Sequence, residues 1–134
     1  MQEHSGILIE RWLEKSQAAM ETAEDNVINN NLEGALNRIY YAIFYMVMAL
    51  AEKENFVTSK HAKLMGWFNK KFIYEDKTFE AVLFETYKKS FAYRQDSDYD
   101  AMYKPDLEEV KLLLDDAKVF VEIVRKVVMQ KQLS

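Results

Sequence analysis

The stretch LEGALNRIYYAIFYMVMALAEK, residues 32–53, decides the fold. After Arg38 it is apolar almost all round a helix, and it does not alternate polar and apolar positions as a strand does. A helix that is hydrophobic on nearly every side must be covered on most sides by other elements. The sequence therefore predicts that this helix lies centrally in an all-α bundle.

A second helix, amphipathic and about twenty residues long, is predicted upstream from Ile7. Its apolar residues recur at i, i+3 and i+4, while charged residues take the other side. It should stop at Asn29-Asn30-Asn31, because asparagine hydrogen-bonds its own backbone and tolerates turn conformations. Asn30 and Glu33 have the spacing of a capping box, which predicts the start of the central helix.

Three further helices are predicted downstream. The first begins after Thr58 or Ser59 as N-cap, the next covers roughly residues 77–93, and the last has Pro105 at its first position. Residues 95–104 are then the one long polar connection. The inward stripes of these helices comprise His61, Leu64, Met65, Phe68 and Phe72; Phe79, Val82, Leu83, Thr86, Tyr87 and Ser90; and Leu107, Val110, Leu113, Leu114, Ala117, Phe120, Val121, Val124 and Val128.

The composition fits one helical domain over residues 1–134. Hydrophobic residues make up 49% of the 134, enough for a core without a disulfide or metal staple. Three glycines and one proline are too few for the turns of an all-β fold of this size. The chain has no cysteine, which excludes disulfides, thiolate zinc sites and cysteine nucleophiles.

Charge and hydropathy argue against two classes of partner, the interior of a membrane and nucleic acid bound non-specifically. The longest uncharged run, Ile39 to Ala51, predicts a buried helix rather than a membrane span, because as a helix it covers ~20 Å of a ~30 Å bilayer core. No secretory signal is visible at the N-terminus, so the cytoplasm is the expected compartment. The net charge of −4 argues against non-specific coating of nucleic acid. Residues 57–94, however, carry eight basic and four acidic residues, which leaves room for a local anion site.

Three alternating aspartates suggest a calcium loop at first sight. Asp96, Asp98 and Asp100 match the opening of an EF-hand loop. The match then fails at Ala101, where the turn needs glycine, and at Leu107, where a bidentate glutamate is required. No Glu-x-x-His pair, nucleophile elbow or phosphate-binding glycine loop is present. We therefore expect no metal and no cofactor.

Arg94 is the more informative residue. It lies four residues beyond Ser90 and seven beyond Tyr87, which places it on the inward face of its helix. An inward arginine is costly to bury unless carboxylates or hydroxyls pair with it, and Asp98 is the obvious partner, with the neighbouring aspartates as substitutes. Two interpretations remain open: a structural pair that fixes the following loop, or a cleft residue that holds a phosphate or another protein's carboxylate.

A column of polar side chains runs along the central helix. Asn37, Tyr41 and Tyr45 follow at i, i+4 and i+8. Such groups seldom stay buried without partners, so they either hydrogen-bond across to the helices that carry Arg94 and His61 or line a ligand cleft. His61 alone is better interpreted as a hydrogen-bonded histidine near a helix N-terminus than as a catalyst.

Together these residues carry a family resemblance. The segments NRIYYAIFYMVMAL (37–50), SKHAKLMGWFNKKFI (59–73) and FAYRQDSDYD (91–100) resemble the branch of the HEPN superfamily with N-R-x-Y-Y-A-x-F, K-H and R-x-x-x-D-Y motifs. The resemblance implies an all-α fold, a single up-and-down bundle of four to five helices, usually a homodimer. Many HEPN proteins are ribonuclease toxins, or toxin-like partners of a minimal nucleotidyltransferase encoded beside them.

The sequence departs from the nuclease members at one position. Those members use an arginine followed four to six residues later by histidine, whereas the residues at these offsets from Arg94 are Asp98, Tyr99 and Asp100. Metal-free RNA cleavage needs a group that exchanges a proton near neutral pH, and histidine with a pKa of ~6.5 does so while an ordinary aspartate at ~3.9 is already ionised. Rescue by His61, from another helix or a second subunit, stays open.

Three hypotheses follow. The preferred one is a non-catalytic or weakly active HEPN protein that binds a nucleotide, RNA or a partner protein, such as a nucleotidyltransferase, in a dimer cleft. The residues expected near that cleft are Asn37, Arg38, Tyr41, Arg94, Asp98 and Tyr99. The alternatives are a metal-independent endoribonuclease toxin that uses Arg94 and His61, and a structural subunit whose apolar faces dock another chain.

Overall fold

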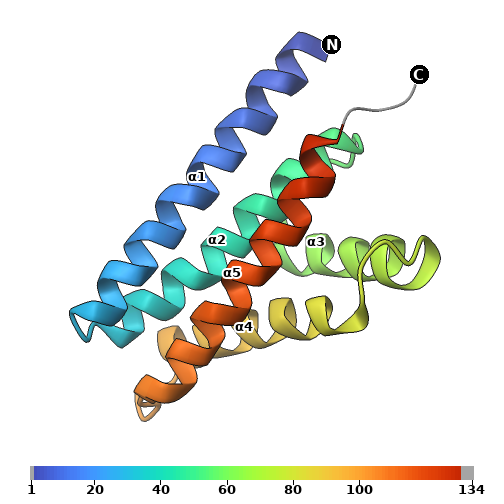
Figure 1. Cartoon of the computed structure of the whole chain (residues 1–134). Helices are drawn as coiled ribbons and strands as arrows, with labels where there is room; N and C mark the ends of the chain where they lie inside the picture. Colours follow the sequence, from blue (N-terminus) through green and yellow to red (C-terminus); the bar gives the residue numbers. More distant parts are fainter. Residues whose placement is uncertain (1, 131–134) are drawn as a thin grey trace.

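The structure is a computed structural model that describes the backbone of residues 2–130 and the side chains of residues 4–130. Its elements in chain order are α1 (Gln2–Ile28), α2 (Leu32–Lys53), α3 (His61–Phe68), the π-helical segment η1 (Asn69–Glu75), α4 (Ala81–Tyr99) and α5 (Leu107–Met129). All elements of this part of the chain are helical, which confirms the predicted all-α fold class. In Figure 1, α1 and α2 run side by side as a hairpin, α5 crosses in front, and α3 and α4 extend to one side.

The helix predicted to be central does occupy the centre. α2 contacts α1, α3, α4 and α5, and buried residues occur on nearly every side of it. It is the one described helix that is long and apolar enough to cross a membrane, but 67% of its apolar window is buried inside the bundle. The covering helices thus account for its apolar composition, as expected for a core helix.

Three helix starts differ from the prediction by one or two residues. Asn31, not Asn30, is the N-cap of α2 and accepts a hydrogen bond from the Gly34 amide, while Asn30 takes a left-handed conformation with φ 58°. The N-cap of α3 is Lys60 rather than Thr58 or Ser59. Pro105 lies outside α5, because the next residue, Asp106, is the N-cap and accepts a hydrogen bond from the Glu109 amide at 3.1 Å. A side-chain oxygen that accepts from an early amide is the usual N-cap device.

The predicted fourth helix is wrong at both ends. α4 begins at Ala81, because Lys77 adopts a left-handed conformation with φ 51° before it. It runs on to Tyr99 instead of ending near Tyr93, so the first half of the polar connection predicted over residues 95–104 is helix. Val82, predicted to be buried, is 60% exposed, since the late start leaves it at the open end of the helix.

An aromatic cluster in the core fixes how α4 lies in the bundle. Phe68 packs against Phe72, Phe79, Tyr87 and Phe120, with ring centroids 5.6 to 6.0 Å apart. Tyr87 is fully buried, and the same face continues through buried Ser90 to Arg94, which confirms the predicted inward face. Anchoring Tyr87 in this cluster therefore turns Arg94 towards α2.

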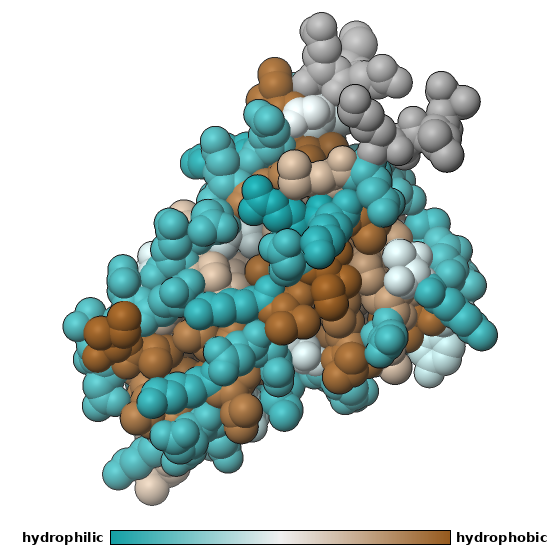
Figure 2. Space-filling model, in the orientation of Figure 1, coloured by the Kyte–Doolittle hydropathy of each residue, from teal (hydrophilic) through white to brown (hydrophobic). Residues whose placement is uncertain are grey.

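Hydrophobic surface remains outside the core. Figure 2 shows brown patches among the charged side chains on the face where α5 lies in front. The exposed apolar residues of α5 are Leu112, Val119, Ile123 and Met129. Scattered surface hydrophobics of this kind are normal for a monomeric protein, so they do not by themselves mark a docking site.

Candidate functional site

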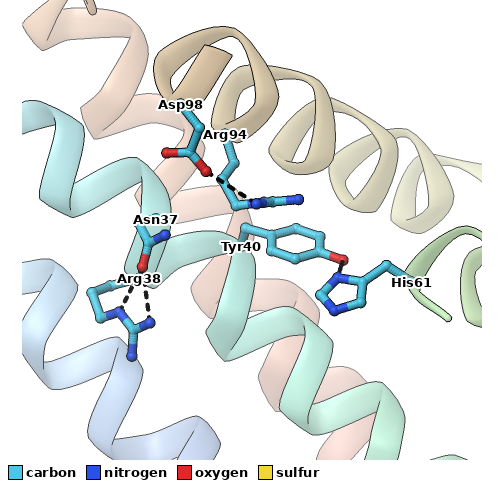
Figure 3. A network of polar contacts seen from close by, with 6 residues as sticks. All are labelled: Asn37, Arg38, Tyr40, His61, Arg94 and Asp98. Atoms are coloured by element: carbon cyan, nitrogen blue, oxygen red, sulfur yellow. Dashed lines mark hydrogen bonds and ion pairs between the residues drawn. The ribbon is translucent and has the colours of Figure 1, made fainter. Parts of the chain in front are cut away.

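The candidate site is centred on Arg94, which projects from α4 towards α2 (Figure 3). Only 9% of the residue is exposed. Its Nη1 donates to Oδ2 of Asp98 at 3.1 Å, one helical turn later on α4. Its Nε is buried and has no hydrogen-bond partner among the described residues. The guanidinium has five N–H donors, so this single ion pair leaves most of its bonding capacity unused.

The Arg94 guanidinium lies against aromatic rings rather than against a second carboxylate. Its central carbon is 4.6 Å from the ring centroid of Tyr40, and 5.7 Å from those of Tyr41 and Phe91. A cation over the face of an aromatic ring is stabilised by the ring quadrupole, by about 2 kcal/mol when the pair is desolvated. These rings hold the buried charge in place without neutralising it.

Tyr40 links Arg94 to the histidine of α3. Its hydroxyl is 2.7 Å from Nδ1 of His61, and Figure 3 shows the ring between the guanidinium and the imidazole. Burial raises the pKa of Tyr40 far above its ordinary value, against a smaller opposing effect of Arg94. The hydroxyl therefore keeps its proton at neutral pH, and the direction of its hydrogen bond with Nδ1 follows the tautomer of the imidazole.

His61 is held as a neutral imidazole. Its ring stacks on Phe44 with a centroid distance of 4.2 Å. Burial lowers the pKa of His61, and the positive charge of Arg94 lowers that pKa further. At neutral pH the side chain therefore adds no charge to the site.

A second arginine approaches the same group of rings from α2. Arg38 is oriented by its neighbour, because Nε and Nη2 both donate to Oδ1 of Asn37, at 3.1 and 2.8 Å. Its guanidinium carbon is 5.2 Å from the ring centroid of Tyr41. Arg38 and Arg94 thus both lie against Tyr41, and in the described part of the chain the salt bridge to Asp98 is the only one that either makes.

The structure brings most, but not all, of the residues predicted for the cleft close together. Arg38, Tyr41, Arg94 and Asp98 converge around the rings of α2, with Asn37 behind Arg38. Tyr99 is 79% exposed and makes no contact with this group that the structure records.

The predicted calcium-like aspartates do not form a loop. Asp96 and Asp98 lie on α4, where residues two apart face in different directions, and only Asp100 follows the helix. Within the described residues, no group of three or more His, Asp or Glu side chains could hold a metal ion.

The polar column was assigned partly to the wrong tyrosine. Tyr41 and Tyr45 are half-buried, and the hydroxyl that reaches His61 belongs to Tyr40. Sequence reasoning missed Tyr40, Phe44 and Phe91 as parts of the site. The consecutive Tyr40-Tyr41 pair was the available signal, but helical spacing alone did not decide which ring points inward.

The arrangement can bind an anion. One buried cation with unused N–H donors and one half-buried cation flank a shared aromatic ring, and a planar guanidinium suits the oxygens of a phosphate or carboxylate. No group in this cluster is an activated nucleophile.

Comparisons with known proteins agree with the fold. Residues 9–127 match a family model described as the HEPN domain. The chain is 30% identical over 125 residues to a Methanocaldococcus jannaschii protein named "Putative toxin MJ0142", covering 93% of this chain and 84% of that protein. It is 31% identical to a "UPF0332 protein" of Thermotoga maritima, covering 90% of this chain and 91% of that protein. A second M. jannaschii protein, "Putative toxin MJ0605", is 32% identical, with 84% and 88% covered.

Proposed function

The chain belongs to the HEPN domain family, and from this membership and the Arg94 cluster we propose that it binds a phosphate-bearing ligand, a nucleotide or RNA, without cleaving it. The observation that carries the proposal is the state of Arg94. Its guanidinium is nine-tenths buried, lies over the Tyr40 ring and, among the residues that the structure describes, pairs with a single carboxylate. A buried cation with unused donors is costly in isolation, and a phosphate would offset that cost.

The proposal assigns roles to the surrounding residues. Arg94 and Arg38 contact the phosphate oxygens, and Asn37 orients Arg38 by accepting two hydrogen bonds from its guanidinium. Asp98 occupies part of the Arg94 guanidinium in the free protein and competes with the ligand. The exposed part of Tyr41 lies between the two cations, where a base or a ribose would rest.

The site lacks a suitable proton carrier in the position next to Arg94. Asp98 is an ion-pair partner of Arg94, and Nδ1 of His61 is engaged in the hydrogen bond with the Tyr40 hydroxyl. General acid-base catalysis needs a group within hydrogen-bond reach of the reacting atoms and in the right protonation state. Binding without turnover is therefore the function that this geometry supports best.

We further propose that the site faces a partner chain. Tyr99 and Met102 follow directly after the Arg94–Asp98 pair and are 79% and 86% exposed. Aromatic and methionine side chains are enriched at interfaces relative to the rest of a protein surface. A second copy of this chain would make the cleft two-sided, and a nucleotidyltransferase is the alternative partner; light scattering coupled to gel filtration separates a dimer from a monomer.

Isothermal titration calorimetry tests the binding proposal. The ligands are ATP, GTP and a short RNA, each titrated into the wild type, Arg94→Ala and the control Arg125→Ala, which alters a half-buried arginine of α5 outside the cluster. We expect binding that Arg94→Ala abolishes and Arg125→Ala leaves unchanged. If none of the three ligands binds the wild type, the ligand proposal is wrong and only partner-protein binding remains.

One observation favours a second candidate, a metal-independent endoribonuclease toxin. His61 lies on the far side of the Tyr40 ring from Arg94, so an arginine and a histidine share one site although they are distant in sequence. Two relatives are named as toxins. This candidate predicts RNA cleavage in the presence of EDTA, lost in both Arg94→Ala and His61→Ala. Intact RNA after prolonged incubation with wild-type protein contradicts it.

A further inference from the structure

A row of aromatic side chains leads away from Arg94 across the α1–α2 hairpin. Tyr40 contacts Tyr41 at 5.2 Å between ring centroids, Tyr41 contacts Tyr45 at 5.6 Å, and Tyr45 stacks on Trp12 of α1 at 5.8 Å. Tyr41, Tyr45 and Trp12 are half-buried, so each presents part of its ring to solvent. The row extends beyond the space that one nucleotide at Arg94 would cover.

Cations accompany this row along its length. Arg94 lies against Tyr40, and Arg38 lies against Tyr41. Lys15 of α1 continues the series, because its Nζ is 5.1 Å from the ring centroid of Tyr45 and 5.9 Å from that of Trp12. Lys15 and Arg38 have no salt-bridge partner in the described residues, so both remain able to bind a phosphate.

A groove of about 220 Å³ between α1 and α2 opens beside the row. Four of its lining residues are Arg11, Lys15, Arg38 and Tyr45, and the only carboxylate is Glu14, which pairs with Arg11 at 3.4 Å. A buried hydrogen bond from Ser16 Oγ to the Ala42 carbonyl, 2.7 Å long, ties the two helices together at this level. The groove is therefore a fixed, basic feature of the hairpin.

The neighbouring face of α1 has the reverse character, and its groove shares Glu14 and Ala18 with the basic one. A groove of about 500 Å³ between α1 and α5 is lined by Glu10, Glu14 and Glu21, with Arg125 as its one cation. The protein is acidic overall, with a net charge of −4, so a basic groove on one side of α1 is a local departure from its average charge. Such a charge separation guides an anionic ligand to the α1–α2 side.

We propose that the row forms a track for a single-stranded polynucleotide that begins at the Arg94 site and continues to Trp12. Phosphates contact Arg94, Arg38 and Lys15, while bases stack on the exposed parts of the aromatic rings. Alternating cations and aromatic rings are the means by which proteins hold single strands without reading their sequence, because every base has a face that can stack. The inference rests on the proposed function, since Arg94 is the shared end of the track.

Fluorescence anisotropy with labelled oligonucleotides tests the track. Oligouridylates of two, four and eight nucleotides are compared with UMP as competitor, and an eight-nucleotide oligothymidylate distinguishes RNA from DNA. We expect the octamer to bind at least tenfold more tightly than the dinucleotide. The magnitude of the slope of log affinity against log salt should fall by ~0.7 in Lys15→Gln, because single strands release about that number of counterions per phosphate contact.

A matched control separates the track from general charge. Lys88 on α4 also lies over an aromatic ring, 5.8 Å from the Phe84 centroid, on another part of the surface. Lys88→Gln should leave octamer affinity unchanged, whereas Lys15→Gln should lower it about fivefold without affecting UMP. With Trp67→Phe, Trp12 is the only tryptophan left, and its fluorescence should be quenched by the octamer.

The outcomes distinguish the two proposals. If UMP and the dinucleotide bind through Arg94 but affinity does not rise with length, or if Lys15→Gln behaves like Lys88→Gln, the track is wrong and the Arg94 site stands. If no nucleotide or oligonucleotide binds at all, both proposals fail. Preference for the RNA octamer over the DNA octamer would assign the strand as RNA.

Discussion

The guanidinium of Arg94 lies 4.6 Å from the centre of the Tyr40 ring, and the hydroxyl of the same ring is 2.7 Å from His61 Nδ1. One side chain of the central helix thus joins a cation from α4 to an imidazole from α3. Because Tyr40 is fully buried, neither partner can move without disturbing the core. The relationship makes Arg94 part of a rigid site rather than a mobile surface charge.

Replacing Asp98 with asparagine should separate stability from binding. The ion pair joins side chains that are 11% and 34% exposed, so its loss should lower the free energy of unfolding by about 1 kcal/mol. Affinity for a phosphate ligand should rise, because the competing carboxylate is gone. Urea unfolding and calorimetry measure the two effects.

The control for this variant is Asp96→Asn, an exposed residue of the same helix without a recorded ion pair. It should leave both quantities near the wild-type values. A fall in affinity of Asp98→Asn would mean that Asp98 binds the ligand instead of competing with it.

Removal of the Tyr40 hydroxyl should destabilise the protein. Tyr40→Phe leaves Nδ1 of His61 without its partner, which should cost about 1 kcal/mol. Tyr45→Phe is the matched control, because it removes a half-exposed tyrosine hydroxyl from the same helix and should change stability by less than about 0.5 kcal/mol. Chemical denaturation compares the two; equal losses would show that the Tyr40–His61 hydrogen bond contributes nothing specific.

His61 predicts how stability changes with pH. Burial, and then Arg94, lower the pKa of His61 below 6.5 in the folded state, so the unfolded chain binds a proton first as pH falls. The contribution of His61 to the free energy of unfolding is therefore constant above about pH 7. The free energy of unfolding decreases as pH falls from about 6.5 towards the pKa of His61 in the folded state.

Thermal unfolding from pH 5 to 8 measures this effect as the difference in stability between the wild type and His61→Gln at each pH. The titration of the carboxylates affects both proteins equally and therefore cancels in this difference. The difference should grow in favour of the variant below about pH 6.5. Parallel curves for the two proteins across this range would show that the folded-state pKa of His61 is not lowered.

Hydrophobic periodicity was sufficient to predict the core and the inward position of Arg94. It was insufficient to predict where the helices end. The central position of α2 and the inward face through Tyr87, Ser90 and Arg94 follow from hydrophobic spacing, which long-range packing does not alter. The end of α4 was missed because the polar residues after Arg94 have no strong preference between helix and loop, and the Arg94–Asp98 pair at i, i+4 itself supports the helical form.

The rest of the site depends on packing between helices. Tyr40 faces the core because it packs against Phe44 of its own helix, His61 of α3 and Phe91 of α4. The approach of His61 to Tyr40 joins residues 21 positions apart, and the row from Tyr41 to Trp12 crosses two helices. No short-range pattern in the sequence encodes these contacts.

The most direct test of the account observes Arg94 itself during ligand binding. In ¹H–¹⁵N spectra of the arginine Nε–H groups, the Arg94 signal is assigned by its loss in Arg94→Lys, and Arg125 serves as internal reference. The account predicts that this signal moves in a saturable way as ATP or an RNA oligomer is added, with the affinity found by calorimetry, while Arg125 stays in place. A stationary Arg94 signal at saturating ligand would contradict it.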